Sequence, residues 1–143
     1  MTTIGTRVEI RQADPATDFP GILAVYAANA WSHARDPDRL RTAVERADLA
    51  LVAVHDGEVV GFVRTMSDGV FAVYIADILV SPDHQGQGFG RRLMQGVLDH
   101  YPLETFHHQV LIAERDAEGF YSRMGLSAVG TFGLTAFIRT KRS

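Results

Sequence analysis

The sequence predicts an α/β fold, a mixed α+β domain whose central, mostly antiparallel sheet is flanked by about four helices. Two segments with helical spacing, 18–30 and 36–47, precede three β-rich runs between residues 49 and 80. A glycine-rich loop at 85–90 then leads into another amphipathic segment. Because short turns join the β-rich runs, we expect these runs to pair as antiparallel neighbours and the helices to cover the sheet.

Composition predicts one soluble domain over residues 1–143 and argues against several classes of function. Of the 143 residues, 46% are hydrophobic, which is enough for one sizeable core. The chain has no cysteine, so thiol catalysis and cysteine-ligated metal sites are excluded. A net charge of -3 provides no basic field for nucleic acid, and no segment is long and apolar enough for a membrane helix. We therefore expect a cytoplasmic protein.

The first third of the chain is expected to form one strand and two helices. Residues 7–11 have strand character. Apolar residues then recur at three- and four-residue steps from Phe19 to Ala30, with Asp18 and Pro20 suited to a helix start. Asp36 is expected to cap the second helix, with Pro37 in its first turn.

Three antiparallel strands are predicted next. The runs 49–55 and 58–66 flank Asp56-Gly57, a pair suited to a hairpin turn with positive φ angles. The run 70–80 is rich in β-branched and aromatic residues and ends at Pro82. Strict alternation would place Asp77 on the same face as Ile75 and Leu79.

The last third is expected to alternate between helices and strands. The periodicity predicts a helix from Gly90 that Pro102 ends, a short strand over 109–113 and a helix over 117–124. Gly125 is placed for a left-handed cap, and 126–138 is expected to form a final hairpin. The predicted order is therefore β-α-α-β-β-β-α-β-α-β-β.

The glycine-rich loop is suited to binding phosphate. Glycines allow backbone N–H groups to converge on an anion, and the N-terminus of the following helix favours negative charge. The loop has no Gly-Lys-Ser/Thr ending, and the strands before it are joined by hairpins rather than by a crossover helix. A nucleoside triphosphate P-loop and a dinucleotide fold are thus disfavoured, whereas an ordinary glycine turn remains an alternative.

Two motifs resemble those of the GNAT superfamily of N-acetyltransferases. Residues 77–84, Asp-Ile-Leu-Val-Ser-Pro-Asp-His, followed by Gln85-x-x-Gly88-x-Gly90, are similar to the acetyl-CoA motif of that superfamily. Residues 117–126 are similar to its later helix, with a Phe-Tyr pair and a closing glycine, although Leu126 replaces the commoner Phe. The resemblance covers nearly the whole chain and implies a GNAT-like fold in a single N-acetyltransferase domain, with the sheet splayed at a bulge.

The resemblance implies acetyl-CoA as the cosubstrate and a set of residues that bind it. Main-chain amides of the loop would bind the pyrophosphate, and Leu79 and Val80 would offer unpaired backbone groups to the pantetheine arm. The predicted cofactor-binding residues are Leu79, Val80, Gln85, Gly86, Gln87, Gly88, Phe89, Gly90 and Arg91.

Two residues are candidates for acid–base catalysis. By its place in the Phe-Tyr pair, Tyr121 would protonate the departing thiolate, the alternative being a core aromatic residue on a helix face. Asp77, a carboxylate in an otherwise apolar strand, is a candidate proton acceptor or amine anchor, and acts directly or through water. The alternative for Asp77 is a strand carboxylate with no chemical role.

The amine acceptor is expected to bind near aromatic side chains that the family places on its substrate side. The candidates are Trp31, His33, Phe71 and Tyr74, and packing is the alternative for each. The turn 66–71 also resembles enzymes that act on arylalkylamines such as serotonin. No metal is expected, because His107 and His108 would point to opposite faces of a strand and the other histidines are scattered.

The prediction is therefore an N-acetyltransferase that moves the acetyl group of acetyl-CoA directly to a primary amine in a ternary complex. The expected partner is a small-molecule amine, with an arylalkylamine as the narrower expectation and a homodimer as a further one. Two alternatives stay open, a non-catalytic acyl-CoA-binding module and an enzyme that acetylates a protein.

Overall fold

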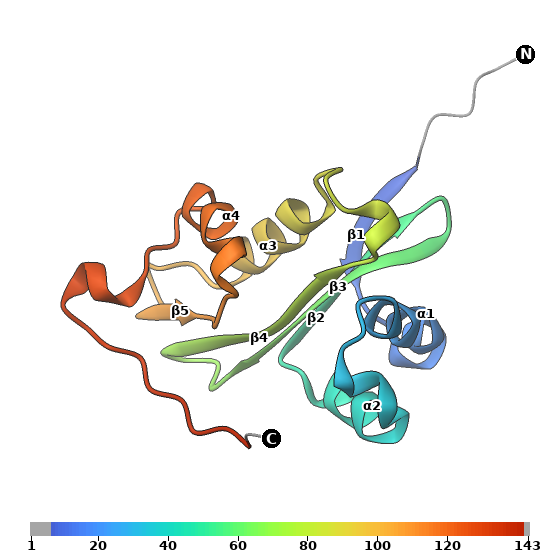
Figure 1. Cartoon of the computed structure of the whole chain (residues 1–143), viewed down its shortest axis with the longest axis horizontal. Helices are drawn as coiled ribbons and strands as arrows, with labels where there is room; N and C mark the ends of the chain where they lie inside the picture. Colours follow the sequence, from blue (N-terminus) through green and yellow to red (C-terminus); the bar gives the residue numbers. More distant parts are fainter. Residues whose placement is uncertain (1–6, 142–143) are drawn as a thin grey trace, which may run out of the picture. The chain divides into compact units, whose positions relative to one another are not determined.

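The computed structural model describes residues 7–141, which form two compact units that divide after Ile112. The first unit contains a five-stranded sheet and three helices, and the second contains one short helix (Figure 1). In the described part of the chain, no helix combines the length and apolar character needed to cross a bilayer.

The sheet has the strand order β1-β2-β3-β4-β5, so its strands lie side by side in sequence order. The strands are β1 (Val8–Gln12), β2 (Leu49–His55), β3 (Glu58–Ser67), β4 (Ala72–Val80) and β5 (His108–Val110). The first four pair antiparallel, and β5 runs parallel to β4. The mixed, mostly antiparallel sheet predicted from the sequence is confirmed.

Helices cover both faces of this sheet (Figure 1). Helices α1 (Pro15–Ala28) and α2 (Pro37–Arg46) lie on one face, and α3 (Phe89–His100) lies on the other. Ile22 and Tyr26 of α1 pack with Phe62 and Leu79 of the sheet in one buried cluster. On the opposite face, Leu93 lies over Gly61 and Gly96 over Leu51. Burial of these apolar surfaces is the main force that holds the layers together.

Helix α1 begins earlier than the expected start at Asp18 and Pro20. Asp14 caps the helix by accepting a hydrogen bond from the Ala16 amide, and Pro15 takes the first helical position. Asp18 is instead buried in the first turn, where it forms an ion pair of 2.7 Å with Arg11. The expectation was wrong because the Asp14-Pro15 pair supplies the stronger start signal.

The other predicted boundaries of the first unit agree with the structure to within a few residues. Asp36 caps α2 through the Arg39 amide, as predicted. The hairpin turn has positive φ at both Asp56 and Gly57, with values of 49° and 83°, which matches the conformation that this pair favours.

A bulge in β4 overturns the expected alternation of faces. Arg64 pairs with Asp77, but the next residue, Thr65, pairs with Ile75, so Ala76 is the extra residue. Arg64 and Thr65 are neighbours on one strand and therefore point to opposite faces. Asp77 consequently faces α1 with Leu79, whereas Ile75 shares the α3 face with Thr65.

The second unit contains α4 (Glu118–Arg123) between two short 3-10 turns, Arg115–Ala117 and Val129–Phe132. Gly125 follows α4 with a φ of 92°, which confirms the predicted left-handed cap. The predicted hairpin over 126–138 is wrong, since the structure assigns no strand among residues 126–141. Amides of this segment bond locally instead, Thr131 to the Ala128 carbonyl and Leu134 to that of Val129.

Candidate active site

The glycine-rich loop joins β4 to α3 and leaves its backbone open to a ligand. It follows a 3-10 turn, Pro82–His84, and Gly86 and Gly88 have φ values of 77° and 90°. A Cβ built on either glycine would meet no protein atom within 4 Å. Gly88 is the N-terminal cap of α3 and carries no side chain to cover the free amides of the first turn. The loop is therefore shaped to receive an anion.

Phe89 anchors this loop to the sheet. Its side chain is buried, and its ring meets the rings of His55 and His84 edge to face, with centroids 5.6 and 6.2 Å apart. Gln85, Gly86, Gln87, Gly88 and Arg91 are exposed around it, and Gly90 is half-buried. The loop is thus fixed at one residue. The Gln85 amide donates to the Pro82 carbonyl at 3.4 Å, whereas the amides of residues 86–88 form no hydrogen bond within the described structure.

Strand β4 has an open edge beside this loop. Strand β5 pairs only with Ala72, Val73 and Tyr74, so the rest of β4 has no partner on that side among the described residues. The Ser81 amide donates to the Val60 carbonyl at 2.7 Å, and this bond sets the alternation of the antiparallel pair. The main-chain groups of Leu79 therefore point toward β3, and those of Ile78 and Val80 point to the open edge.

This alternation places the main-chain groups of Val80 at the open edge, where its carbonyl is already paired, and turns those of Leu79 toward β3, although both residues were expected to offer unpaired groups. Leu79 packs its side chain under α1, and Ile78 is the open-edge position that the sequence reasoning missed. The Val80 carbonyl accepts hydrogen bonds of 3.0 Å from the side chains of both Asn29 and Gln85. These contacts tie the end of α1 and the loop to the open edge.

Asp77 is the centre of a buried polar cluster under α1. Its Oδ2 accepts hydrogen bonds from the Tyr26 hydroxyl at 2.7 Å and from Arg64 Nε at 2.6 Å. Burial and the adjacent Asp77 carboxylate raise the pKa of Tyr26, so this phenol stays neutral and donates. Tyr26 and Arg64 were not predicted, although an arginine inside the apolar strand 58–66 was a usable signal.

Two of the predicted acceptor residues adjoin this cluster. His33 Nε2 lies 3.7 Å from Asp77 Oδ2, and its Nδ1 is buried without a hydrogen-bond partner in the described structure. The ring of Trp31 packs against Tyr26 and His33 at centroid distances of 5.8 and 5.7 Å. The structure thus brings Trp31, His33 and Asp77 together.

Phe71 and Tyr74 lie away from this cluster, at the start of β4. Phe71 stacks on His107 with ring centroids 4.6 Å apart, and its side chain is largely exposed. Tyr74 pairs with Met66 across β3 and β4, and both are exposed on the α2 side of the sheet. Of the four predicted acceptor residues, the structure therefore brings Trp31 and His33 to the Asp77 cluster, whereas Phe71 and Tyr74 have other neighbours.

Tyr121 belongs to the second unit, in the middle of α4. Its side chain is half-buried beside Phe120, with ring centroids 5.0 Å apart. Burial raises the pKa of Tyr121 above that of a free phenol. This hydroxyl is therefore protonated at neutral pH, as a general acid must be.

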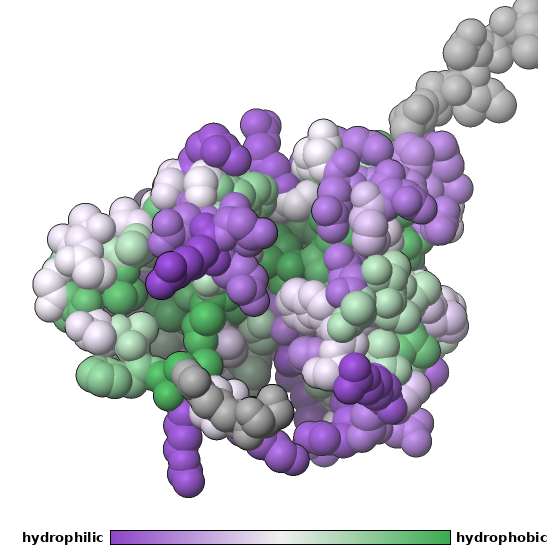
Figure 2. Space-filling model, viewed as in Figure 1, coloured by the Kyte–Doolittle hydropathy of each residue, from purple (hydrophilic) through white to green (hydrophobic). Residues whose placement is uncertain are grey.

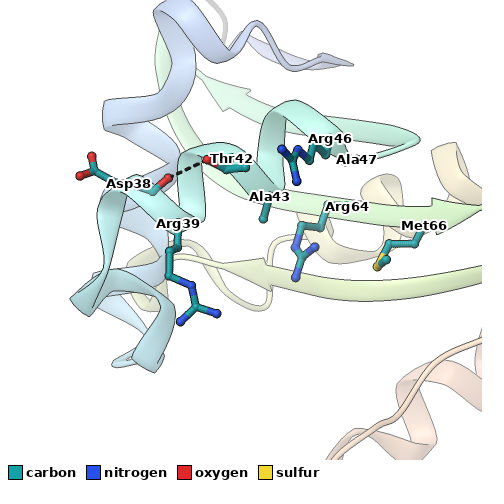
Figure 3. Close-up of a pocket in the computed structure, with 8 residues that line it drawn as sticks. All are labelled: Asp38, Arg39, Thr42, Ala43, Arg46, Ala47, Arg64 and Met66. Atoms are coloured by element: carbon teal, nitrogen blue, oxygen red, sulfur yellow. Dashed lines mark hydrogen bonds between the residues drawn. The ribbon is translucent and has the colours of Figure 1, made fainter.

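A groove of about 460 Å³ runs between α2 and β3, on the sheet face that carries Asp77 (Figure 3). Helix α2 and the residue after it supply Asp38, Arg39, Thr42, Ala43, Arg46 and Ala47. Strand β3 supplies Arg64 and Met66. The groove is next to the Asp77 cluster because Arg64 belongs to both. Among the described residues, no group of three or more His, Asp or Glu side chains is placed to hold a metal ion.

Comparison with protein families and solved structures gives a consistent result. Residues 14–126 match the model of the acetyltransferase (GNAT) family. A GNAT family acetyltransferase from Streptococcus pneumoniae TIGR4 has a similar structure, with a TM-score of 0.79, 25% identity and coverage of 97% of this chain and 100% of that chain. Glucosamine-6-phosphate N-acetyltransferase from Arabidopsis thaliana has a TM-score of 0.72 over 95% of this chain and 98% of that one, at 16% identity. At that identity, the likeness concerns the fold alone.

Curated relatives are longer proteins. Serotonin N-acetyltransferase 2, chloroplastic, of Oryza sativa subsp. japonica is 28% identical over 122 residues, which cover 82% of this chain and 60% of the rice protein. GCN5-related N-acetyltransferase 1, chloroplastic, of Arabidopsis thaliana is 26% identical over 138 residues, 94% of this chain and 69% of that protein. The chain thus spans about 60% of the length of the rice relative.

Proposed function

Because this chain belongs to the GNAT acetyltransferase family, we propose that it transfers the acetyl group of acetyl-CoA directly to a primary amine in a ternary complex. One observation carries the proposal: the open edge of β4 ends in the loop of exposed glycine amides that begins α3. A peptide-like arm and a phosphate group are the two ligand features that these surfaces fit.

The residues of the first unit divide the binding of acetyl-CoA among them. We assign the main-chain groups of Ile78 and the amide of Val80 to the pantetheine arm, which they would bind as a strand binds an added neighbour, because the Val80 carbonyl is already paired. We assign the amides of residues 86–90 to the pyrophosphate, because the Gln85 amide is bonded to Pro82, and Arg91 adds positive charge in the first turn of α3. The cosubstrate supplies an activated thioester, so the protein has to position the reactants and move protons.

Proton removal from the amine is assigned to Asp77 together with His33. An alkylamine has a pKa near the ~10.4 of lysine and is mostly protonated at neutral pH, so a proton acceptor is needed before attack. His33 is partly exposed, and its Nε2 lies 3.7 Å from the carboxylate. Tyr26 and Arg64 hold that carboxylate in place.

Tyr121 is assigned the opposite role of proton donor to the leaving thiolate. The amine nitrogen forms a bond to the acetyl carbon, the carbon–sulfur bond breaks, and the sulfur takes a proton. The ammonium gives one proton to the acceptor before attack, and the neutral amine loses a second as the amide forms, which balances the proton that the sulfur takes. A phenol whose pKa is raised by burial stays protonated until this step.

The proposal is tested by incubating the full chain with acetyl-CoA and a panel of primary amines, and by measuring the release of free CoA thiol. The panel includes serotonin, because the rice relative bears that name and Trp31 offers an aromatic surface beside Tyr26 and His33. Amine-dependent thiol release, with the acetylated amine identified by mass spectrometry, is expected. Acetyl-CoA binding without turnover on any amine would favour a non-catalytic module, and turnover only on protein lysines would favour a protein acetyltransferase.

A further inference from the structure

The groove between α2 and β3 carries more positive charge than the chain as a whole. Arg39, Arg46 and Arg64 line it together with one acidic residue, Asp38, whereas the net charge of the chain is -3. Figure 3 shows the Asp38 side chain pointing away from Arg46 and Arg64. In the view of Figure 2, hydrophilic side chains gather over α2. Because Asp77 balances the charge of Arg64, the net positive charge of the groove comes from Arg39 and Arg46, which makes it a local basic site on an acidic protein.

The arginines of this groove have unused hydrogen-bonding capacity. In the described structure, the only hydrogen bond recorded for Arg64 uses Nε, so its terminal nitrogens are left for the groove. Arg39 Nε lies 4.0 Å from Asp36 Oδ2, but both side chains are exposed, and an exposed ion pair contributes little binding energy. No salt bridge within residues 7–141 involves Arg46. Guanidinium groups placed in this way match the oxygens of a carboxylate or a phosphate.

The groove also borders the proposed reaction site. Arg64 is the cross-strand partner of Asp77 and bonds to it, so one end of the groove borders the proposed proton acceptor. Ala43, Ala47 and Met66 add apolar surface to the groove beside the charged groups. A small molecule with an acid group at the arginines could therefore extend along this surface and present its amine to Asp77.

We propose that the groove binds a carboxylate or phosphate group of the acceptor, so that the natural acceptor is an amine that also carries an acid. This inference rests on the proposed acetyl transfer and specifies its substrate class. A purely cationic arylalkylamine would gain nothing from Arg46 and would be repelled by it, whereas an amino acid or an amino-phosphate would form charge-assisted hydrogen bonds.

Matched acceptor pairs test the proposal by steady-state kinetics. Phenylalanine and β-alanine are compared with their amides, and O-phosphoethanolamine is compared with ethanolamine. An amide removes the negative charge at nearly constant shape. It also makes the amine less basic, so more of the amine is neutral and reactive. If the groove has no role, the amide should therefore have the higher kcat/KM. We expect kcat/KM to be about tenfold or more higher for acid-bearing acceptors. Comparison of the amino-acid pairs with the phosphate pair shows whether the groove binds a carboxylate or a phosphate.

Two variants on the same helix separate groove binding from a general effect on the protein. Arg46→Gln should raise KM for the acid-bearing acceptor about tenfold and leave KM for acetyl-CoA and for the amide unchanged. Arg41 is the matched control, because its guanidinium lies 4.6 Å from the centre of the Phe19 ring and does not line the groove. Arg41→Gln should leave KM unchanged for the acid-bearing acceptor, for the amide and for acetyl-CoA.

The outcomes distinguish this inference from the function on which it rests. If amides or serotonin are acetylated as well as the acids, or if Arg46→Gln and Arg41→Gln behave alike, the inference is overturned and acetyl transfer stands. If no amine of any class releases thiol from acetyl-CoA, the proposed function fails and the inference fails with it.

Discussion

Asp77 illustrates how one side chain connects stability and chemistry in this protein. Its carboxylate is only 7% exposed, yet it accepts hydrogen bonds from Tyr26 and Arg64 and lies close to His33. A buried charge without partners is costly, so each partner depends on the others. The cluster that holds the proposed proton acceptor is therefore also part of the core under α1.

The coupling between Asp77 and Arg64 can be measured directly. Asp77→Asn and Arg64→Gln should each lower the free energy of unfolding, because each leaves a buried partner uncompensated. The double variant should lose less than the sum of the two, by about 0.5–3 kcal/mol. Urea unfolding of the three variants gives this coupling energy, and simple additivity would contradict a mutual interaction.

Tyr121 is expected to act through its hydroxyl alone. Tyr121→Phe should lower kcat by about 100-fold, which is typical of a lost general acid, and leave KM for acetyl-CoA unchanged. Tyr101→Phe is the control, because the hydroxyl of Tyr101 is held by Asp48 and Thr65 in the core. An unchanged kcat in the Tyr121 variant would remove the acid role.

The loop and the helices show how glycines position the site. Gly88 lets the chain leave β4 with a φ of 90° and enter α3 without a side chain over the free amides. Gly21 serves another purpose, since a Cβ there would lie 2.8 Å from Cβ of Val59, so α1 packs directly on β3. Both positions require glycine, one for its backbone conformation and one for close packing.

Substitution at Gly88 should weaken cofactor binding in addition to the backbone strain that a side chain causes at a positive φ. Gly88→Val places a side chain where the protein leaves open space and where we propose that the pyrophosphate binds. Calorimetry should show at least a tenfold weaker affinity for CoA. Gly69→Val is a matched control, because Gly69 has a φ of 75° and equally open surroundings in the turn before β4. Equal affinities in the two variants would exclude the loop from the phosphate site.

Gly21→Ala should destabilise the protein although alanine is the better helix former. The helix preference for alanine is about 0.5–1 kcal/mol, whereas overpacking against Val59 costs about 1–3 kcal/mol. A net loss is therefore expected in thermal or urea unfolding. Gly119→Ala in α4 provides the comparison, since the atom nearest to its Cβ is the flexible end of Arg123 at 3.2 Å. A gain of stability at Gly21 would show that α1 can move off the sheet.

The stability of the whole chain should depend on buried phenols at high pH. Burial and the hydrogen bond to Asp48 raise the pKa of Tyr101 from 10.0 to about 12. Between these values the unfolded chain releases the phenolic proton while the folded chain retains it, so the stabilising contribution is complete below pH 10 and is lost toward pH 12. Urea unfolding between pH 9 and 12 should show this fall, and Tyr101→Phe should make it shallower. If the free energy of unfolding fell equally steeply with pH in Tyr101→Phe, Tyr101 would not be the cause of the fall.

Local signals in the sequence were sufficient for most of the fold and for the position of the glycine-rich loop. The Asp36-Pro37 start, the Asp56-Gly57 turn and the glycines of 85–90 act through backbone conformation and neighbouring hydrogen bonds, which depend on adjacent residues. The order of the first nine predicted elements follows from such signals and is confirmed. The hairpin predicted for 126–138 failed because a strand depends on a neighbouring strand, which local signals do not report. In the structure, this segment forms local hydrogen bonds and a turn instead.

The arrangement of the site depended on contacts between distant segments. The bulge at Ala76 turns Asp77 toward α1, and only the pairing of β3 with β4 reveals that extra residue. The partners Tyr26 and Arg64 lie 51 and 13 positions from Asp77 in the chain. The basic groove requires one face of α2 to lie beside β3. Periodicity reports which face of a strand or helix is apolar, but not which strand or helix lies against it, and packing supplies that information.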